Sequence, residues 1–196
     1  MKRFFIILLI LIVLAVGIHL YRNTLSPNVM AARLSAVKIP DWIDQQIIDV
    51  DGSSRRGVDL EDLQDIVIHY VGNPGTSAQQ NHDYYANPTS EVSSHFVIGL
   101  NGEIIQCIPL WEKSSASNHR NRDTISIEVC HPDASGKFTD ASYRSLVKLT
   151  AWLCDSCGLK RSAVIRHYDV TGKQCPLYFV THEDTWKQFL QAVKDA

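Results

Sequence analysis

The chain has 196 residues, a formal net charge of -2 at pH 7 and a sequence pI near 6.4. A chain of this length forms one domain with an appendage, and such a domain buries roughly two thirds of its unfolded surface without needing disulfides. The nearly balanced charge excludes broad electrostatic attraction to nucleic acid, so we expect no nucleic-acid partner and a recognition site that depends on shape.

The N-terminal segment differs from the rest of the chain in its apolar character. Lys2 and Arg3 precede an uninterrupted apolar run from Phe4 to Ile18. This run is short for a membrane span, which needs about 20 residues, although Leu20 and Tyr21 extend it. The small residues at 15–17 would also suit a signal peptidase. Residues 1–21 are therefore predicted to be either a membrane anchor or a cleaved signal peptide, with the rest of the chain outside the cytoplasmic membrane.

The next segment, residues 22–60, contains Pro27, Pro40 and the polar stretch "DGSSRRG". Such composition predicts a tether that leads into the folded domain. One apolar patch within it, "WIDQQIIDV", predicts a short helix that caps the domain. The domain itself is predicted to comprise residues 61–196.

Strand and helix patterns alternate along residues 61–196. Short segments rich in β-branched and aromatic residues predict strands at "DIVIHY", "SSHFVIGL", "EIIQCIPL", "TISIEVC" and "AVIRHY". Helical periodicity predicts helices at "SAQQNHDYYA", where Ser77 is the expected N-cap, from about Asp140 to Cys157, and at "EDTWKQFLQAVKDA". Asn101–Gly102 predicts a tight hairpin between the second and third strands. This order predicts a single α/β domain whose mixed central sheet is flanked by helices on both faces.

The stretch "RHYDVTGKQCP" at 166–176 holds two soft metal ligands, His167 and Cys175. On one continuous helix they would lie roughly 12 Å apart along the axis, too far to share an ion. They can converge only if the chain bends, and Gly172 permits a turn while Pro176 prevents a helix from continuing. The segment is therefore predicted to be a strand end entering a loop that folds back, with the two side chains forming an incomplete metal site.

A catalytic zinc site needs one more protein ligand, because it takes three and leaves a fourth position open. His69 is the best candidate, since it ends the predicted strand "DIVIH" at the edge of the sheet. His95 in "SSHFVIG" is its rival. A single histidine in such a position is more often a hydrogen-bonded core residue than a ligand.

Four further cysteines, Cys107, Cys130, Cys154 and Cys157, would allow up to two disulfides in an exported protein. The pair at 154–157 lies in a helical pattern and has no second such pair to complete a zinc knuckle. Core packing or a bridge is therefore favoured for it over a redox or zinc motif.

A proton-transfer residue is predicted on the strand "TISIEVC", where alternation places Glu128 on the opposite face from Ile127 and Val129. In a covered strand this carboxyl would be poorly solvated and its pKa would rise, which suits a general base near neutral pH. An exposed glutamate on an edge strand explains the pattern equally well.

The assembled motifs resemble the zinc-dependent N-acetylmuramoyl-L-alanine amidases of type 2, the group related to T7 lysozyme and the peptidoglycan recognition proteins. The resemblance extends from about Gln64 to Trp186. It rests on "IVIHYVGNPGTSAQQN", "SSHFVIGLNGEIIQ", "NRDTISIEV" and "RHYDVTGKQCP". It implies the fold of that group.

Carried over by position, the resemblance implies that His69, His167 and Cys175 bind Zn²⁺. It further implies that Glu128 is the base and that Lys173 stabilises the oxyanion.

Three details of this assignment are specific to the chain. Ser94 stands where some relatives have a tyrosine, and "SSAS" at 114–117 replaces a "WHAG"-like run, so sugar contacts from that loop are not carried over. Asp169 is expected either to orient a ligand or to cap the following turn.

The implied activity is zinc-dependent hydrolysis of the amide between N-acetylmuramic acid and the L-alanine of the stem peptide in bacterial peptidoglycan. The expected partners are peptidoglycan or muropeptides, and residues 1–21 are expected to contact the membrane. The protein is expected to be a monomer that acts outside the cytoplasm. Two alternatives remain open, a non-catalytic peptidoglycan-binding module and a zinc peptidase that cuts within the stem peptide.

Overall fold

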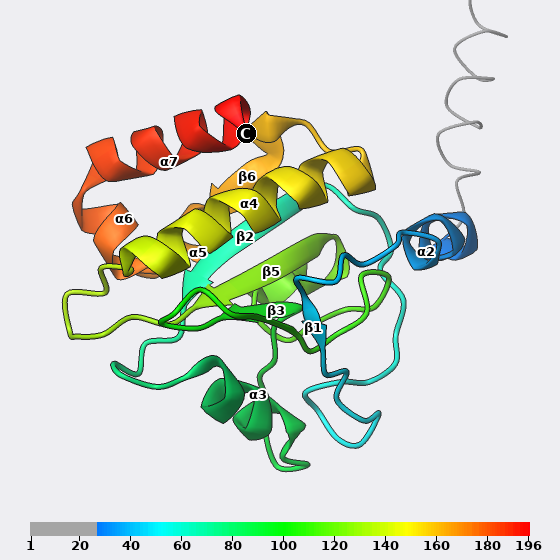
Figure 1. Cartoon of the computed structure of the whole chain (residues 1–196). Helices are drawn as coiled ribbons and strands as arrows, with labels where there is room; N and C mark the ends of the chain where they lie inside the picture. Colours follow the sequence, from blue (N-terminus) through cyan, green and yellow to red (C-terminus); the bar gives the residue numbers. More distant parts are fainter. Residues whose placement is uncertain (1–26) are drawn as a thin grey trace, which may run out of the picture.

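The computed structural model describes residues 27–196, so the predicted anchor or signal at 1–21 lies outside the described residues. The helices are α2 (Pro27–Ser35), α3 (Ala78–Ala86), α4 (Asp140–Cys157), α5 (His167–Thr171), α6 (Leu177–Thr181) and α7 (Glu183–Asp195) (Figure 1). The strands are β1 (Asp44–Gln45), β2 (Asp65–Tyr70), β3 (Phe96–Ile98), β4 (Ile104–Gln106), β5 (Thr124–Val129) and β6 (Val164–Arg166), and the short 3₁₀ helices are η1 (Asn118–Arg122) and η2 (Arg161–Ala163). Within residues 27–196, no helix is both long enough and apolar enough to cross a membrane.

All six strands join one mixed sheet in the order β1-β4-β3-β5-β2-β6. Only β3 and β4 are antiparallel neighbours; the other pairs are parallel. The predicted hairpin is confirmed, because β3 and β4 are joined through Asn101 and Gly102, and Gly102 adopts a φ of 86°. That angle lies in the left-handed region, which glycine enters without steric cost.

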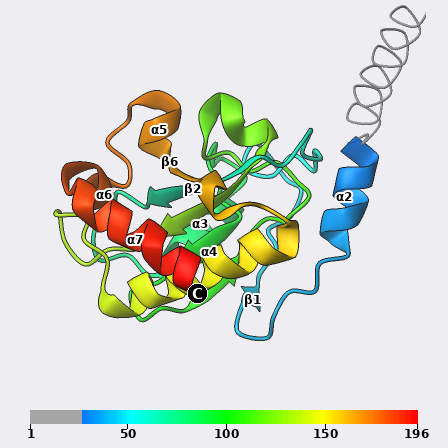
Figure 2. The same cartoon turned by 90° about the horizontal axis from the view of Figure 1, so that it is seen from above.

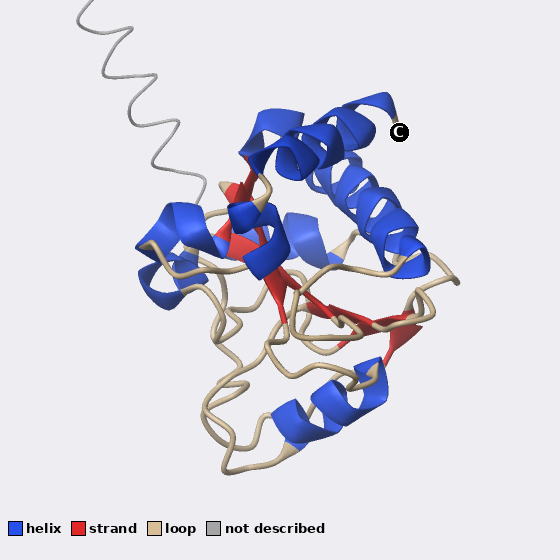
Figure 3. Cartoon of the chain, turned by 90° about the vertical axis from the view of Figure 1, so that its left-hand side faces the viewer, coloured by secondary structure: helices blue, strands red, loops and turns tan. Residues whose placement is uncertain are grey.

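Helices cover both faces of the sheet, as the sequence predicts. Helices α4 and α7 lie on one face and α3 on the other (Figures 1 and 3). Ile125, Ile127 and Val129 of β5 belong to the larger core cluster, beneath α4 and α7. Each such side chain stabilises the fold by about 1.5–3 kcal/mol when fully buried. Glu128, between Ile127 and Val129, instead lines a pocket together with residues of α3, so the predicted alternation is confirmed.

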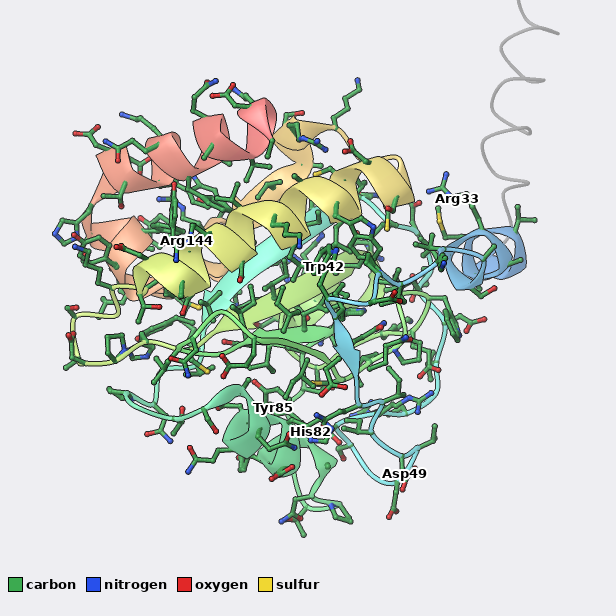
Figure 4. All side chains as sticks on the ribbon, in the orientation of Figure 1. Arg33, Trp42, Asp49, His82, Tyr85 and Arg144 are labelled. Atoms are coloured by element: carbon green, nitrogen blue, oxygen red, sulfur yellow. The ribbon has the colours of Figure 1, made fainter. Side chains whose placement is uncertain are left out.

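Helix α3 is fixed at its start and along its inner face. The hydroxyl of Ser77 accepts from the backbone N–H of Gln80 at 3.2 Å, and the Gln80 side chain accepts from the backbone of Ser77 at 2.9 Å. This reciprocal pair forms a capping box. Tyr85 is buried beneath the helix and His82 Nε2 contacts the carbonyl of Gln46 at 2.8 Å (Figure 4). The N-cap predicted at Ser77 is confirmed.

Replacing this cap is expected to destabilise the protein measurably. Ser77→Ala leaves the backbone N–H of Gln80 without its acceptor, and we expect a loss of about 1 kcal/mol in the free energy of unfolding. Ser77→Asp keeps an acceptor and is expected to retain nearly full stability. Urea unfolding measures both variants, and equal stability of Ser77→Ala and Ser77→Asp would contradict this role.

The segment before the domain packs against it. Leu34 of α2 is buried, and Arg33 donates to the carbonyl of Cys157 at 2.6 Å (Figure 4). Trp42 lies beneath the ammonium group of Lys148, 4.0 Å from the ring centroid, and meets Trp152 edge-on. These contacts join the start of the described chain to α4.

The helix predicted at "WIDQQIIDV" is wrong. This stretch contains β1, which pairs with β4 in the register Asp44 with Ile105. The pairing continues past the strand, where the backbone N–H groups of Gln46 and Ile48 donate to Gln106 and Cys107 at 3.0 Å. The edge of the sheet supplies backbone partners that the local apolar pattern does not reveal, and they hold the segment extended.

All five cysteines lie in the described part of the chain, and each is buried with a free thiol. Cys154 and Cys157 belong to the core cluster beneath α4. Of the two readings of this pair, core packing is the one that the structure shows.

Candidate metal centre

The strand register brings the predicted site residues to one end of the sheet. Strands β2 and β5 are parallel neighbours, and His69 stands directly opposite Glu128. Strand β6 lies on the other side of β2, and His167 is the first residue of α5, directly after β6 (Figure 2). Because the carboxyl ends of parallel neighbours meet at the same edge, these side chains converge where such sheets usually bind ligands.

A tight reversal returns Cys175 to His167. Helix α5 ends at Gly172, whose φ is 78°, and the backbone N–H of Tyr168 then donates to the carbonyl of Cys175 at 2.9 Å. The predicted bend at Gly172 is confirmed. The segment differs from the expected loop in one respect, because His167 begins a short helix.

Three side chains offer ligand atoms that all lie within 4.8 Å of one another: His69, His167 and Cys175. The two Nδ1 atoms are 3.1 Å apart, and the Sγ of Cys175 is 3.8 Å from Nδ1 of His69. The three residues are only 1%, 4% and 2% exposed. Two imidazoles and one thiol are a donor set typical of zinc, so the residues present fit a metal ion.

Burial favours the neutral form of all three donors in the absence of a cation. It lowers the pKa of His69 well below the usual value, with the charges of His167 and Lys173 adding to the effect. It also lowers the pKa of His167, again with Lys173 contributing. Burial, and then the nearby Glu128, raise the pKa of the Cys175 thiol to about 12. Neutral imidazoles keep a free lone pair for a cation, and a bound cation would displace the thiol proton.

The rival third ligand, His95, lies elsewhere in a hydrogen-bonded core position. Its Nδ1 accepts from the backbone N–H of Ser126 at 3.0 Å, and its Nε2 contacts the carbonyl of Glu112 at 2.9 Å. Burial lowers the pKa of His95 to about 4. Both ring nitrogens are occupied, so the structure excludes His95 from the cluster.

Glu128 lies beside the cluster in a covered strand. Its side chain is 16% exposed, and its Oε1 is 3.8 Å from Nδ1 of His69. Its Oε2 is buried and has no hydrogen-bond partner. Burial raises the pKa of Glu128 to about 8, partly offset by Lys173. Strand β5 lies between β3 and β2, so the alternative of an exposed glutamate on an edge strand is excluded.

A pocket of about 810 Å³ opens over the cluster on the α3 side of the sheet. The exposed side chain of Lys173 and that of Glu128 line it together with the three candidate ligands. The remaining wall is uncharged and mixes polar, aromatic and aliphatic side chains, among them Asn73, Gln80, Asn81, Tyr84, Tyr85 and Val92.

The residues that contact the outer nitrogens of the two histidines are not apparent in the sequence. His69 Nε2 lies 3.2 Å from the hydroxyl of Ser117, and His167 Nε2 lies 2.7 Å from Oδ1 of Asn118. Asp169 instead accepts from the backbone N–H of Arg166 at 2.8 Å and pairs with its guanidinium. Asp169 therefore caps the start of α5, three residues before it, and contacts none of the three candidate ligands; neither the orienting role nor a cap on the following turn is seen.

Comparison with known proteins places this fold and site in a family. Residues 59–177 match the family model described as N-acetylmuramoyl-L-alanine amidase. The chain belongs to this family. It is 27% identical to the N-acetylmuramoyl-L-alanine amidase CwlL of Bacillus licheniformis over 166 residues, which cover 76% of this chain and 46% of CwlL. It is 28% identical to the N-acetylmuramoyl-L-alanine amidase BlyA of Bacillus subtilis (strain 168), covering 75% of this chain and 45% of BlyA.

Solved structures give the same result for the fold. The catalytic domain of XlyA superposes with a TM-score of 0.68 at 28% identity, covering 77% of this chain and 98% of that domain. A PlyL variant superposes with a TM-score of 0.70 at 22% identity, covering 79% of this chain and 99% of that one. The predicted single α/β domain of the amidase type is confirmed. The chain spans about half the length of the curated relatives it matches.

Proposed function

We propose that this chain hydrolyses the amide bond between N-acetylmuramic acid and the L-alanine of the stem peptide in peptidoglycan, using Zn²⁺ held by His69, His167 and Cys175. The main support for this proposal is that the ligand atoms of these three buried side chains lie within 4.8 Å of one another in the lining of a large pocket. Membership of the amidase family supports the choice of substrate. Because that substrate lies outside the cytoplasmic membrane, we place the activity there too.

Glu128 is proposed to carry the proton. When bound, Zn²⁺ supplies Lewis-acid chemistry, which polarises a carbonyl and lowers the pKa of water. The carboxylate of Glu128, which lines the pocket, takes the proton released as water attacks the amide carbonyl, and returns it to the departing nitrogen of alanine. A carboxyl whose pKa is about 8 is suited to both transfers near neutral pH.

Lys173 is proposed to stabilise the negative charge that develops on the carbonyl oxygen. It lines the pocket two residues before Cys175, and its charge already acts on Glu128 and on both histidines. An ammonium group aimed at developing charge in a partly closed site is worth more than in water.

Lys173→Ala is therefore expected to fold, to keep its metal and to lose activity by roughly 10² to 10³ in kcat. Lys187→Ala, on the exposed face of α7, serves as the matched control and is expected to retain wild-type turnover. Turnover on purified peptidoglycan and the zinc content of each variant are measured. Full activity of Lys173→Ala would exclude its proposed role.

The reaction itself is tested by product analysis. Digestion of purified peptidoglycan should release peptides with a free N-terminal alanine and glycan strands with intact lactyl groups, both visible by mass spectrometry. New termini within the stem peptide would identify a zinc peptidase instead. Binding to peptidoglycan without any product would identify a recognition module.

A further inference from the structure

One loop, residues 114–121, contacts both histidines of the candidate metal centre at their Nε2 atoms, on the side away from the cluster. The Nδ1 atoms of His69 and His167 face each other across 3.1 Å, while each Nε2 atom points to the loop that precedes β5. There Ser117 Oγ lies 3.2 Å from Nε2 of His69, and Asn118 Oδ1 lies 2.7 Å from Nε2 of His167. The two nitrogens of each ring are thus divided between the centre and the loop.

The chemistry of these contacts determines which nitrogen carries the proton. An amide oxygen can only accept, so Asn118 requires His167 to hold its proton on Nε2, which leaves the Nδ1 lone pair free. A hydroxyl can accept or donate. Ser117 therefore accepts from Nε2–H of His69 whenever Nδ1 of that ring donates its lone pair to a cation.

The backbone of the loop is held in a costly conformation at this point. Asn118 has a φ of 56°, the one positive value recorded for a non-glycine residue within 27–196. Asparagine tolerates the left-handed region better than most residues, but the conformation still costs energy that the surroundings must offset. The side chain of Asn121 contributes, since its Oδ1 accepts from the backbone N–H groups of Ala116 and Ser117 at 3.1 and 2.6 Å.

A buried hydroxyl network joins the loop to the sheet. Ser114 Oγ contacts Ser126 Oγ of β5 at 2.8 Å, and Ser126 is bonded in turn to His95. Ser117 itself is fully buried. The loop is therefore held to the sheet through Ser114 and to its own turn through Asn121. These contacts direct the side chains of Ser117 and Asn118 toward the imidazoles.

From these contacts we infer that Asn118 and Ser117 are positioning residues: Asn118 selects the Nε2–H tautomer of His167, and Ser117 accepts Nε2–H of His69 when a cation takes the Nδ1 lone pair of that ring. Both Nδ1 atoms are then presented to the metal. This inference rests on the proposed metal-binding role of the two histidines. It assigns a function to the loop that contains "SSAS" at 114–117.

The test uses Asn118→Gly in the full chain. Glycine adopts a positive φ freely, so this variant removes the amide without straining the backbone. We expect zinc affinity, measured by competition with a chromophoric chelator, to fall about 10- to 100-fold. The ¹⁵N spectrum of the metal-free protein should show His167 losing its Nε2–H preference, while the unfolding temperature stays equal or rises. Asn118→Asp keeps an acceptor and should restore both affinity and tautomer.

His119→Ala is the matched control, because it deletes an exposed imidazole from the same turn, and its zinc affinity should remain at the wild-type value. Ser117→Ala removes the acceptor for Nε2–H of His69 and should also lower zinc affinity. Wild-type zinc affinity and tautomers in Asn118→Gly would overturn the positioning role and leave the proposed metal site standing. Absence of zinc binding by the wild-type chain would overturn both.

Discussion

Glu128→Gln is expected to slow hydrolysis strongly and at the same time to stabilise the metal-free protein. Burial raises the pKa of this carboxyl from 4.5 to about 8 in the folded chain. The folded state therefore holds the proton across a range in which the unfolded chain has released it. A glutamine in the same place carries no such titration, because it stays neutral at every pH.

The sign of this effect follows from proton linkage. Protonated Glu128 favours the fold fully below pH 4.5, and this contribution is lost as the pH rises to about 8, since the native state binds more protons in that window. At pH 7 the accumulated cost to the wild type is on the order of 3 kcal/mol, and glutamine should recover much of it.

Urea unfolding between pH 4 and 9 in the presence of a chelator measures this difference. The stability of Glu128→Gln minus that of the wild type should be near zero at pH 4 and grow to a plateau above pH 8. Glu91→Gln, at an exposed position, should show no such trend. Loss of the general base should lower kcat by roughly 10² to 10⁴. A stability difference that does not vary with pH would show that Glu128 is ionised in the fold at neutral pH.

Zinc is expected to stabilise the metal-free protein and to release a proton as it binds. A ligand present at 1,000 times its Kd stabilises the native state by about 4 kcal/mol. Because burial raises the pKa of the Cys175 thiol to about 12, the thiol is protonated at neutral pH and zinc must displace that proton. The apparent affinity should therefore rise about tenfold per pH unit between pH 6 and 8.

Calorimetry in two buffers with different ionisation enthalpies counts the released protons. Cys175→Ser should lose most of the zinc affinity, the proton release and the thermal shift together. Cys107→Ser, which alters a buried thiol outside the cluster, should keep the zinc-dependent shift whatever its own stability. Zinc binding without proton release would show that the thiol is not a ligand.

Elements with strong local periodicity were predictable from the sequence. Strands β2 and β5, the long helix α4, the capped start of α3 and the Asn101–Gly102 hairpin all lie where the patterns place them. In each case the local pattern and the tertiary environment favour the same structure. The convergence of His69, His167 and Cys175 also followed, because strand ends, a glycine turn and ligand chemistry are visible in the residues themselves.

Elements defined by distant partners were not predictable. Strand β1 forms because β4, some sixty residues later, offers free backbone groups at the edge of the sheet. The early end of β6 has a local cause, since the carboxylate of Asp169, three residues on, takes the backbone N–H of Arg166 and starts a helix at His167. Neither partner leaves a periodic signal in the segment whose structure it determines.

The loop contacts of the two imidazoles were missed for the same reason. Ser117 lies 48 positions from His69 in the sequence, and Asn118 lies 49 positions from His167. Serine and asparagine before a strand are ordinary loop residues by composition. Only the folded arrangement shows that their acceptors face the outer nitrogens of the imidazoles.

X-ray absorption spectroscopy of the zinc-loaded chain tests the central claim most directly, because it reports the atoms bound to the metal. We expect one zinc per chain with one sulfur at about 2.3 Å, two imidazole nitrogens at about 2.0–2.1 Å and a remaining light-atom position. The sulfur shell should vanish in Cys175→Ser. In His69→Ala the number of imidazole ligands should fall from two to one. A spectrum without sulfur, or a zinc shell unchanged in both variants, would contradict this ligand set.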